Sequence, residues 1–458
     1  MTGAALPWVE PEDFVATHAA GRPRSFWLDG AGARPWSGRH SYVGWLRPAD
    51  LSLTYDAHRR VVTAHREGGS EEVADDIFTA LQHHTPEGEG EGEGAGGWVG
   101  YFGYASRRDL PARLDASSVP DACWLRADRR VVFDHEHRTV RAIGDERWQA
   151  EVADLVERTE VASAVPASSP PQVLRTLDPG GYAEAFVRVQ SELRRGNSYE
   201  TNLTYRTEVD SGLDPLSAYR RLRRANPAPY ACFVTHDGVS LLSTSPERFA
   251  TISPDGWLET RPIKGTTPRY DDPVDDRAAA ELLRSDPKFR GENLMIVDLL
   301  RNDMSMVCQV GTVEVTDLMH VESYPTVHQL VTTIRGRLEP GTTAIAAVRT
   351  LFPGGSMTGA PKLRTMQIIA DVETSGRGPY AGALGWLGDD GRADLGIVIR
   401  SLVHEGGRYT LGTGGGITVR SDCDEEYAET QWKVSALFGA LAGSSASRTD
   451  GGPDIPAR

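Results

Sequence analysis

The 458-residue chain is longer than a typical single domain, which predicts two or three structural units or one large composite fold. Its 39% hydrophobic and 25% charged residues are ordinary for a globular protein. A net charge of −15 argues against a nucleic-acid-binding surface, which needs a basic stripe. The chain has no basic leader with an apolar core and no run of about eighteen apolar residues, so we expect a cytoplasmic protein without a membrane span. The four cysteines form no CxxC pair, and we expect them to be reduced.

The N-terminal part of the chain predicts short strands with one helix between them. Apolar runs broken by Gly and Pro predict strands over residues 24–45, and an amphipathic pattern predicts a helix over 73–83. The alternating Glu and Gly of residues 86–97 cannot form a buried face, so we expect a mobile loop there. Further elements are a strand over 98–104, strands within 122–143 and a helix over 146–159.

A segment rich in Ser, Pro and Ala, residues 161–172, is the clearest linker in the sequence. We therefore divide the chain into residues 1–165 and 175–442, followed by a tail, 443–458, that we expect to be disordered. Helices and strands follow the linker without strict alternation, which predicts an α+β fold rather than a doubly wound sheet. Helices are expected over 179–195, 286–303 and 425–441, a β-meander over 230–261 and β-hairpins over 380–419.

Lys264, in the run TRPIKGTTPR, is the candidate nucleophile. It follows a strand-like segment and lies between Pro262 and Gly265. A lysine is nucleophilic only when its amine is neutral, so burial or a nearby cation must lower its pKa. The alternative is a lysine at a strand end that forms a surface ion pair.

Glu247, in STSPERF, is the candidate general acid. It follows Pro246 at the end of a predicted strand, where a glutamate is usually solvated. A desolvated carboxyl group there can protonate a leaving hydroxyl.

The run ENLMIVDLLRND places carboxylates along an apolar helix, where they are costly to bury without a partner. We expect Arg301 to pair with Asp298 as a structural contact rather than a catalytic one. Glu292, at the start of the apolar run, is the better metal ligand.

The run FPGGSMTGAPKLR predicts a helix that starts near Pro361, with Ser356 or Thr358 near its N-cap. The free N–H groups of such a helix end can bind an anion. Gly354 and Gly359 have the spacing of a phosphate-binding loop, but Ala and Pro follow where that loop needs Lys and Ser or Thr. A nucleotide-binding loop is therefore excluded.

Three successive glycines, Gly414, Gly415 and Gly416, let the backbone approach a ligand closely and offer N–H donors to a carboxylate. Beyond this glycine loop, Glu426 and Glu429 stand three residues apart on one face of the closing helix. Together with Glu292 they form an oxygen site suited to Mg²⁺. The alternative is a solvated helix with a surface pair between Glu429 and Lys433.

These segments resemble the signature segments of the chorismate-utilising enzymes, and they occur in that family's order: PIKGT, ENLMIVDLLRND, FPGGSMTGAPK, and GGGI followed by EEYAETQWK. The resemblance covers residues 179–441, more than half of the chain. It implies an α+β fold with a large two-layer β-sandwich core, helices on the outside and the site between the layers. It also implies that residues 1–165 form an anthranilate-synthase-like region interleaved with a catalytic domain over 175–442.

Two positions separate the branches of this family. Anthranilate-forming members resemble this chain but carry Ala where it has Lys264, and isochorismate- and salicylate-forming members carry a water-activating Lys where it has Glu200. The chain therefore resembles the branch that forms 4-amino-4-deoxychorismate, although many bacterial members have Gln at the position of Glu200.

The resemblance also implies roles for the candidate residues. Lys264 attacks C2 of chorismate, Glu247 protonates the departing C4 hydroxyl, and ammonia then adds at C4. Mg²⁺ is held by Glu292 and Glu429, with Glu426 behind it through water. The other implied substrate contacts come from Arg400, Lys433, the N–H groups of Gly415 and Gly416, and His328 near the leaving hydroxyl, although a core histidine held by hydrogen bonds is the alternative for the last.

Ammonia needs a source, and no Gly-x-Cys-x-Gly motif surrounds any of the cysteines. The resemblance therefore implies a separate glutaminase subunit, with a product for p-aminobenzoate and folate or for a related secondary metabolite. Two alternatives stay open. One is an enzyme that forms anthranilate or 2-amino-2-deoxyisochorismate, and the other is an inactive paralogue that binds the glutaminase or a ligand as a regulatory module.

Overall fold

The computed structural model describes residues 3–30, 38–86, 96–324 and 327–442. Most of the expected mobile loop at 86–97 and the whole expected tail at 443–458 lie outside these residues. Within the described ranges, none of the helices combines the length and the apolar character that crossing a membrane requires.

The first sheet has 11 antiparallel strands drawn from both sides of the linker. Strand β1, from the N-terminal part, pairs with β2 on one side and with β12, from beyond the linker, on the other. The strand order is β10 (Gln172–Arg175), β11 (Glu200–Asp210), β23 (Arg408–Ile417), β22 (Ser401–Glu405), β13 (Val239–Ser245), β12 (Tyr230–His236), β1 (Arg24–Asp29), β2 (His40–Trp45), β8 (Arg130–Asp134) and β9 (Thr139–Ile143), with β19 (Gly359–Ala360) paired to β11.

The second sheet has 12 strands and is built in the same mixed way, because β6 from the N-terminal part pairs with β20 from the C-terminal part. Its order is β16 (Ile263–Pro268), β18 (Val327–Arg337), β15 (Trp257–Arg261), β14 (Arg248–Ile252), β21 (Ala393–Ile397), β20 (Ala383–Gly388), β6 (Gly97–Phe102), β7 (Ala122–Arg126), β3 (Ser52–Asp56), β4 (Val61–Arg66) and β5 (Gly69–Ala74), with β17 (Glu314–Ser323) paired to β18.

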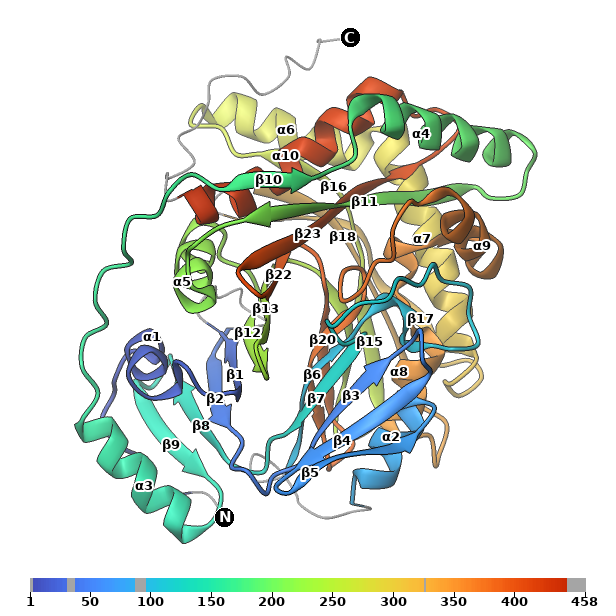
Figure 1. The fold of residues 1–458 in the computed structure, drawn as a ribbon. Coiled ribbons are helices and arrows are strands. Elements are labelled where there is room, and N and C mark those ends of the chain that lie inside the picture. The colour runs from blue at the N-terminus through green and yellow to red at the C-terminus, as the bar shows by residue number, and fades with distance from the viewer. Residues whose placement is uncertain (1–2, 31–37, 87–95, 325–326, 443–458) are drawn as a thin grey trace.

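The two sheets face each other, and helices cover their outer sides (Figure 1). Between the sheets lies an apolar cluster that joins Phe26 and Cys232 of the first sheet to Val99 and Leu384 of the second. Two larger clusters fill the spaces between each sheet and its helices. This architecture confirms the predicted α+β fold with a two-layer β-sandwich core.

The helices form where the sequence provides caps and apolar faces. Asp178 caps α4 by accepting a hydrogen bond from Gly181 N, and Asp145 caps α3 in the same way. The helices α4, α6 and α10 gather at one end of the molecule, at the top of Figure 1. The helices are α1 (Pro11–Phe14), α2 (Ile77–His84), α3 (Glu146–Glu157), α4 (Pro179–Arg194), α5 (Pro215–Ala225), α6 (Pro273–Ser285), α7 (Pro287–Ser305), α8 (Ala344–Leu351), α9 (Lys362–Val372) and α10 (Cys423–Ala442).

Most of the predicted elements are present, with two corrections. The helix predicted over 73–83 begins only at Ile77, because Asp76 caps it and the preceding residues form β5. The strands predicted over 230–261 are present, but they do not form one meander. β12 and β13 belong to the first sheet, whereas β14 and β15 belong to the second.

The chain crosses between the sheets at two neighbouring places that matter for the site. The first crossing lies between β13 and β14 and contains Glu247, and the second lies between β21 and β22 and contains Arg400. Two backbone hydrogen bonds join each crossing to the strand that leads into the other. Ile397 N donates to Glu247 O at 3.0 Å, and Thr244 N donates to Arg400 O at 3.2 Å. They therefore hold both residues at the junction of the two layers.

Candidate active site

Lys264 lies on β16, at the edge of the second sheet, and its side chain is only 11% exposed. The pairing of β16 with β18 shifts register between Ile263 and Thr266, and Gly265 has a φ of 85°. Such a bulge turns the local backbone and redirects the neighbouring side chain. As a result the ammonium group of Lys264 points to the first sheet, where it donates a hydrogen bond to Glu200.

Glu200 is the first residue of β11 and is 1% exposed. One of its oxygens, Oε1, accepts the hydrogen bond from Lys264, while Oε2 has no hydrogen-bond partner among the described residues. The pair joins the two sheets across the site. Gly416 makes room for it, because a Cβ atom there would lie 2.3 Å from Glu200 Oε1 and 3.4 Å from Lys264 Nζ.

The charge of Lys264 differs from the neutral amine that its proposed role as a nucleophile requires. Burial lowers the pKa of Lys264, but the carboxylates of Glu200, Glu292 and Glu247 outweigh burial, so the pKa lies above its ordinary value. In this state of the protein Lys264 carries a proton. A reaction at its nitrogen therefore needs a group that removes this proton.

Glu247 lies at the first crossing and is buried. Ser356 Oγ donates a hydrogen bond of 2.7 Å to Glu247 Oε1. Burial raises the pKa of Glu247 to about 7, against the smaller opposing effects of Ser356 and Lys264. A carboxyl group with this pKa holds a proton near neutral pH, which fits the predicted general acid.

The three glycines lie in strand β23 rather than in the predicted loop. Gly414, Gly415 and Gly416 pair with Thr204, Leu203 and Asn202 of β11. Their contribution is space, because a Cβ atom at Gly415 would lie 3.0 Å from Glu426 Oε2 and one at Gly416 would meet the pair of Glu200 and Lys264. The prediction that the N–H groups of Gly415 and Gly416 bind a carboxylate stays a prediction.

Helix α10 presents Glu426, Glu429 and Lys433 on one face, as the spacing of three and four residues predicts. Lys433 Nζ donates to Glu429 Oε1 at 2.7 Å and to Gly414 O at 2.9 Å. Burial and the neighbouring Glu429 raise the pKa of Glu426. Burial also raises the pKa of Glu429, but Lys433 and further lysines reverse this and lower it.

Glu292 approaches the same region from α7. Burial raises its pKa to about 7, and the carboxylates of Glu200 and Glu426 add to this effect. Lys288, four residues earlier on the same helix, places its ammonium group 3.6 Å from Glu426 Oε1. The carboxylates of Glu426, Glu292 and Glu429 raise the pKa of Lys288 against burial. Lys288 is thus a cation inside the acidic group that the prediction did not include.

The lysine count contains a signal that locates this region. Four of the 49 Lys and Arg residues are lysines, and three of these, Lys264, Lys288 and Lys433, act electrostatically on Glu429. The fourth, Lys362, pairs with buried Asp303. Because Arg is the cation almost everywhere else in the chain, the positions of these three lysines indicate the candidate site.

A divalent cation fits the donor set of Glu292, Glu426 and Glu429. Burial and neighbouring carboxylates raise the pKa of Glu292 and Glu426, so these groups lack a full counter-charge, and the Lys288 ammonium offsets part of their charge. Their oxygens do not all lie within 4.8 Å of one another. Mg²⁺ tolerates this spread, because it usually keeps several waters and binds one or two carboxylates.

The region around the predicted anion-binding helix end needs a correction. Helix α9 starts at Lys362 with Pro361 as its N-cap, and neither Ser356 nor Thr358 caps it. The intervening residues form β19, so Thr358 is buried and donates to the carbonyl groups of Gly354 and Gly355. Ser356 instead binds Glu247. The sequence did not predict the contact between Ser356 and Glu247, because the two residues are 109 positions apart.

Two further predicted residues flank this centre. Arg400 has a φ of 48° at the second crossing, and its guanidinium group lies 5.9 Å from the ring of Trp432 and 3.3 Å from Asn226 Oδ1. His328 is buried on β18, where Nδ1 is 2.7 Å from Ser323 Oγ and Nε2 is 3.0 Å from Asp276 Oδ1. Both ring nitrogens are thus engaged, as in the core histidine considered as an alternative. The roles of Arg400 and His328 at a substrate stay predictions.

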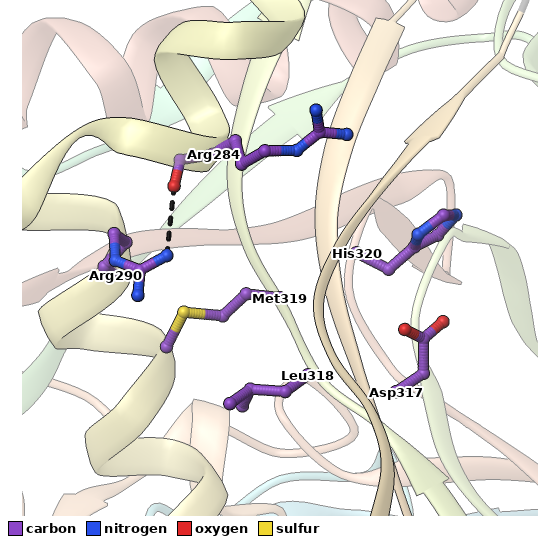
Figure 2. A pocket seen from close by; sticks show the side chains of 6 residues that line it. All are labelled: Arg284, Arg290, Asp317, Leu318, Met319 and His320. Carbon is purple, nitrogen blue, oxygen red and sulfur yellow. Dashed lines mark hydrogen bonds between the residues drawn. The ribbon is translucent and has the colours of Figure 1, made fainter.

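Two other clusters of side chains lie outside this centre. A surface hollow of about 330 Å³ between α6, α7 and β17 is lined by two arginines, an aspartate, a histidine and two apolar side chains (Figure 2). It contains none of the predicted site residues.

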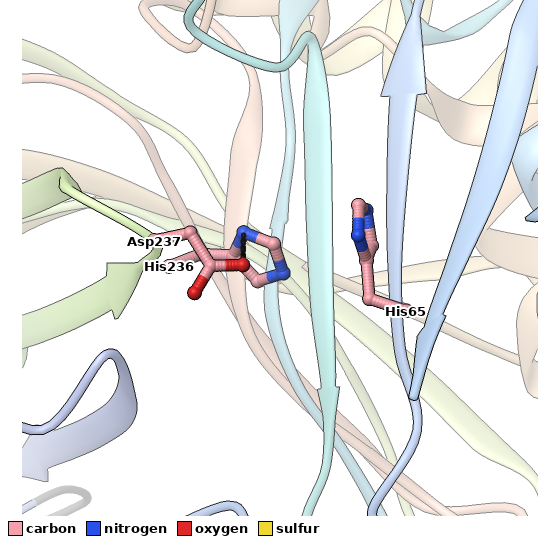
Figure 3. A group of neighbouring side chains, drawn as sticks. All are labelled: His65, His236 and Asp237. Carbon is pink, nitrogen blue, oxygen red and sulfur yellow. Dashed lines mark ion pairs between the residues drawn. The ribbon is translucent and has the colours of Figure 1, made fainter. Parts of the chain in front are cut away.

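The second cluster brings His65 from β4 opposite His236 and Asp237 at the turn after β12 (Figure 3). The hydroxyls of Thr54 and Ser70 bind both ring nitrogens of His65. Burial lowers the pKa of both histidines; Asp237 opposes this effect, and the charge of Arg24 adds to it. A cation at this place disfavours a second cation, so we do not assign a metal centre here.

Comparisons with known sequences identify the family of the chain. The sequence profile of the chorismate binding enzymes matches residues 26–439. An aminodeoxychorismate synthase from Streptomyces pristinaespiralis is 40% identical, over 93% of this chain and 64% of its own length. An aminodeoxychorismate synthase component 1 from Klebsiella aerogenes is 40% identical, over 76% of this chain and 77% of its own length.

The fold has the same relatives. The crystal structure of anthranilate synthase component I from Streptococcus pneumoniae superposes with a TM-score of 0.76 at 26% identity, covering 88% of this chain and 93% of that chain. The chain spans less than two thirds of the length of the Streptomyces relative. By its sequence and its fold, the chain belongs to the family of chorismate binding enzymes.

Proposed function

We propose that the chain is the synthase component that converts chorismate and ammonia to 4-amino-4-deoxychorismate. The observation that carries the proposal is the buried Lys264, in contact with Glu200 and electrostatically coupled to the protonated Glu247. The names of the relatives from Streptomyces pristinaespiralis and Klebsiella aerogenes support the same reaction. The name "component 1" supports a second component, and we propose that this is a glutaminase that supplies ammonia.

The proposed reaction has two substitutions. The Nζ atom of Lys264 bonds to C2 of chorismate while the C4–O bond breaks, and Glu247 donates the proton with which the hydroxyl leaves as water. Ammonia then bonds to C4 and the bond between C2 and Nζ breaks. The Glu247 carboxylate accepts the surplus proton of the new amine. A covalent intermediate divides one difficult substitution into two easier ones.

Chorismate is a dicarboxylate, and the proposed site meets it with cations in an otherwise acidic protein. Lys433 lies beside Gly414 on β23, and Arg400 lies at the second crossing. Mg²⁺ held by Glu292 and Glu429, with Glu426 through water, would neutralise carboxylate charge when bound. In its absence the fixed charges of Lys288 and Lys433 offset part of the carboxylate charge.

The test is the product formed from chorismate, Mg²⁺ and ammonium chloride, identified by liquid chromatography and mass spectrometry. We expect 4-amino-4-deoxychorismate. Lys264→Ala should reduce its formation by about three orders of magnitude or more, because the nucleophile is lost. Lys264→Arg is the matched control, since it keeps the charge but not the nucleophile, and it should be as inactive.

Three other outcomes of this experiment would each contradict one part of the proposal. Anthranilate or 2-amino-2-deoxyisochorismate as the product would assign the chain to another reaction of the family. Near-normal turnover in Lys264→Ala would contradict the proposed covalent intermediate on Lys264. Binding of chorismate without any product would favour a regulatory paralogue.

A further inference from the structure

The contact between Glu200 and Lys264 has a consequence for how the lysine becomes reactive. We propose that Glu200 accepts the proton of the Lys264 ammonium group and later returns it, so that the nucleophile forms without proton exchange with solvent. The proposal rests on the proposed function, because it assigns the proton acceptor for the covalent lysine.

The geometry meets the first requirement of a general base, which is hydrogen-bond contact with the proton that it removes. Lys264 Nζ donates directly to Glu200 Oε1, and Glu200 is the only carboxylate within ion-pair distance of Lys264 among the described residues. The second oxygen, Oε2, is buried without a hydrogen-bond partner among these residues. It is therefore able to hold the proton away from Nζ once Oε1 has received it.

The packing around the pair keeps it together and dry. Glu200 is 1% exposed and the Lys264 side chain is 11% exposed. Gly416, on the strand that pairs with β11, leaves the space in which the two groups meet. Water has little access to the pair, so a proton that leaves Nζ passes to Glu200 more readily than to solvent.

Charge favours the same transfer. Burial disfavours the ammonium and the carboxylate alike, and moving the proton from one to the other neutralises both. The other groups that act on Lys264 come from separate elements, namely Glu247 at the first crossing and Glu292 and Glu429 on α7 and α10. The negative charge of the ionised Glu429 helps to retain the proton in the resting protein, so the transfer is coupled to the arrival of substrate and of a cation that offsets this carboxylate.

The proton balance of the two substitutions is complete. Glu200 takes a proton from the Lys264 ammonium, and the neutral Nζ bonds to C2 as the C4 hydroxyl leaves with the proton of Glu247. When ammonia has bonded to C4 and the bond between C2 and Nζ breaks, Glu200 returns its proton to Lys264. Glu247 regains a proton from the new C4 ammonium group, and both residues end as they began.

The experiment measures the Lys264 step alone. The protein is mixed with chorismate and Mg²⁺ without ammonia, and samples are quenched at successive times. Peptide mass spectrometry then locates the adduct. The assignment is unambiguous because the chain has four lysines. In the wild type we expect an adduct on Lys264 whose rate of formation falls above about pH 7 only because Glu247 loses its proton, since the Lys264 proton moves within the pair.

The decisive variant is Glu200→Gln, which keeps an acceptor oxygen for Nζ but cannot take its proton. We expect adduct formation to be slower than in the wild type by about 100-fold at pH 7, and the ratio of the variant rate to the wild-type rate to rise by about tenfold per pH unit, because Lys264 must then lose its proton to solvent. Glu200→Asp keeps the carboxylate, so it should be slower than the wild type by a ratio that does not change with pH. Glu208→Gln, on the same strand and outside the site, should behave as the wild type.

A rate in Glu200→Gln that equals or exceeds that of the wild type at pH 7, or a ratio of the two rates that does not change with pH, would overturn the proposal. Thermal unfolding of each variant shows whether it is folded. If Glu200→Gln is not folded, a ratio of the Glu200→Asp rate to the wild-type rate that rises with pH would overturn the proposal instead. A wild-type protein that makes product but never forms the Lys264 adduct would refute the covalent lysine of the proposed function. That failure is visible in the wild type alone, whereas failure of the Glu200 assignment appears only in the variants.

Discussion

At the scale of the residue, the site depends on acidic side chains whose surroundings separate their protonation states. Glu247 is buried beside Ser356 and holds a proton near neutral pH, whereas the Lys433 charge lowers the pKa of Glu429 against the effect of burial. This difference suits the proposed roles, in which one carboxyl group donates a proton and the other binds a cation. This division follows from burial and neighbouring charge, because the side chains are chemically identical.

The Glu247→Gln variant tests the general acid. Gln keeps an oxygen for the Ser356 hydroxyl but has no proton to donate, so we expect product formation to fall by about 100-fold or more. In the wild type, activity should decline as the pH rises above about 7, because Glu247 then loses its proton. Lys264 and Lys433 are the charges that act on this carboxyl group, and both favour its ionised form. An unchanged pH profile in the variant would contradict the assignment.

The same variant should change stability with a defined sign. The folded pKa of Glu247, about 7, is above the ordinary value of 4.5, so the folded protein binds this proton more tightly than the unfolded chain. The contribution to stability is present below pH 4.5 and is lost as the pH rises through 7. Glu247→Gln should therefore gain thermal stability relative to the wild type across this range, as measured by thermal unfolding at several pH values.

At the scale of the element, helix ends and strand irregularities place the reactive groups. The bulge in β16 directs Lys264 to the opposite sheet, and the glycines of β23 leave the space that it enters. Asp286 caps α7 by accepting a hydrogen bond from Lys288 N at 2.7 Å, which sets Lys288 in the first turn. Glu292 follows one turn later on the same face, so both side chains reach the acidic group.

Lys288→Met tests whether this lysine competes with a divalent cation. Removing its charge leaves Glu292, Glu426 and Glu429 less compensated, so we expect Mg²⁺ to bind about fivefold more tightly, a modest gain because the Lys288 side chain is partly exposed. The measurement is calorimetric titration of Mg²⁺ without chorismate. Lys288→Arg keeps the charge and should bind Mg²⁺ as the wild type does. Weaker binding in Lys288→Met would show that the lysine supports the cation rather than opposing it.

At the scale of the whole molecule, the two sheets make the N-terminal and C-terminal parts of the chain inseparable. β1 lies between β2 and β12, and β6 lies between β7 and β20, so each sheet contains strands from both sides of the linker. The apolar cluster between the sheets also draws on both parts. The site sits where the layers meet, at the Glu200 and Lys264 contact and at the two crossings.

Cutting the chain within the linker tests this arrangement. Residues 166–458 produced alone should show no cooperative unfolding, because strands β12 and β20 would lose their partners and expose apolar faces. Mixing them with residues 1–165 during refolding should restore the transition of the intact chain. Circular dichroism and size-exclusion chromatography provide the measurement. A cooperative transition in the C-terminal fragment alone would contradict a shared core.

The sequence by itself determined the local elements and the family of the chain. Apolar periodicity and turn residues located β1, β6, α4 and α10, and the motifs around Lys264 and Glu429 identified the family. These signals are local, since each depends on residues within a few turns of helix or strand.

Only the tertiary structure determined which side chains of the candidate site carry a proton. Lys264 meets Glu200 from 64 residues earlier, and Ser356 meets Glu247 from 109 residues away. These contacts arise because the strands after residue 245 and after residue 400 change sheets, a choice that depends on packing against distant strands. The charge of a buried group depends on its neighbours in space, so the sequence could name Lys264 as a nucleophile but not show that it rests as an ammonium ion bound to Glu200.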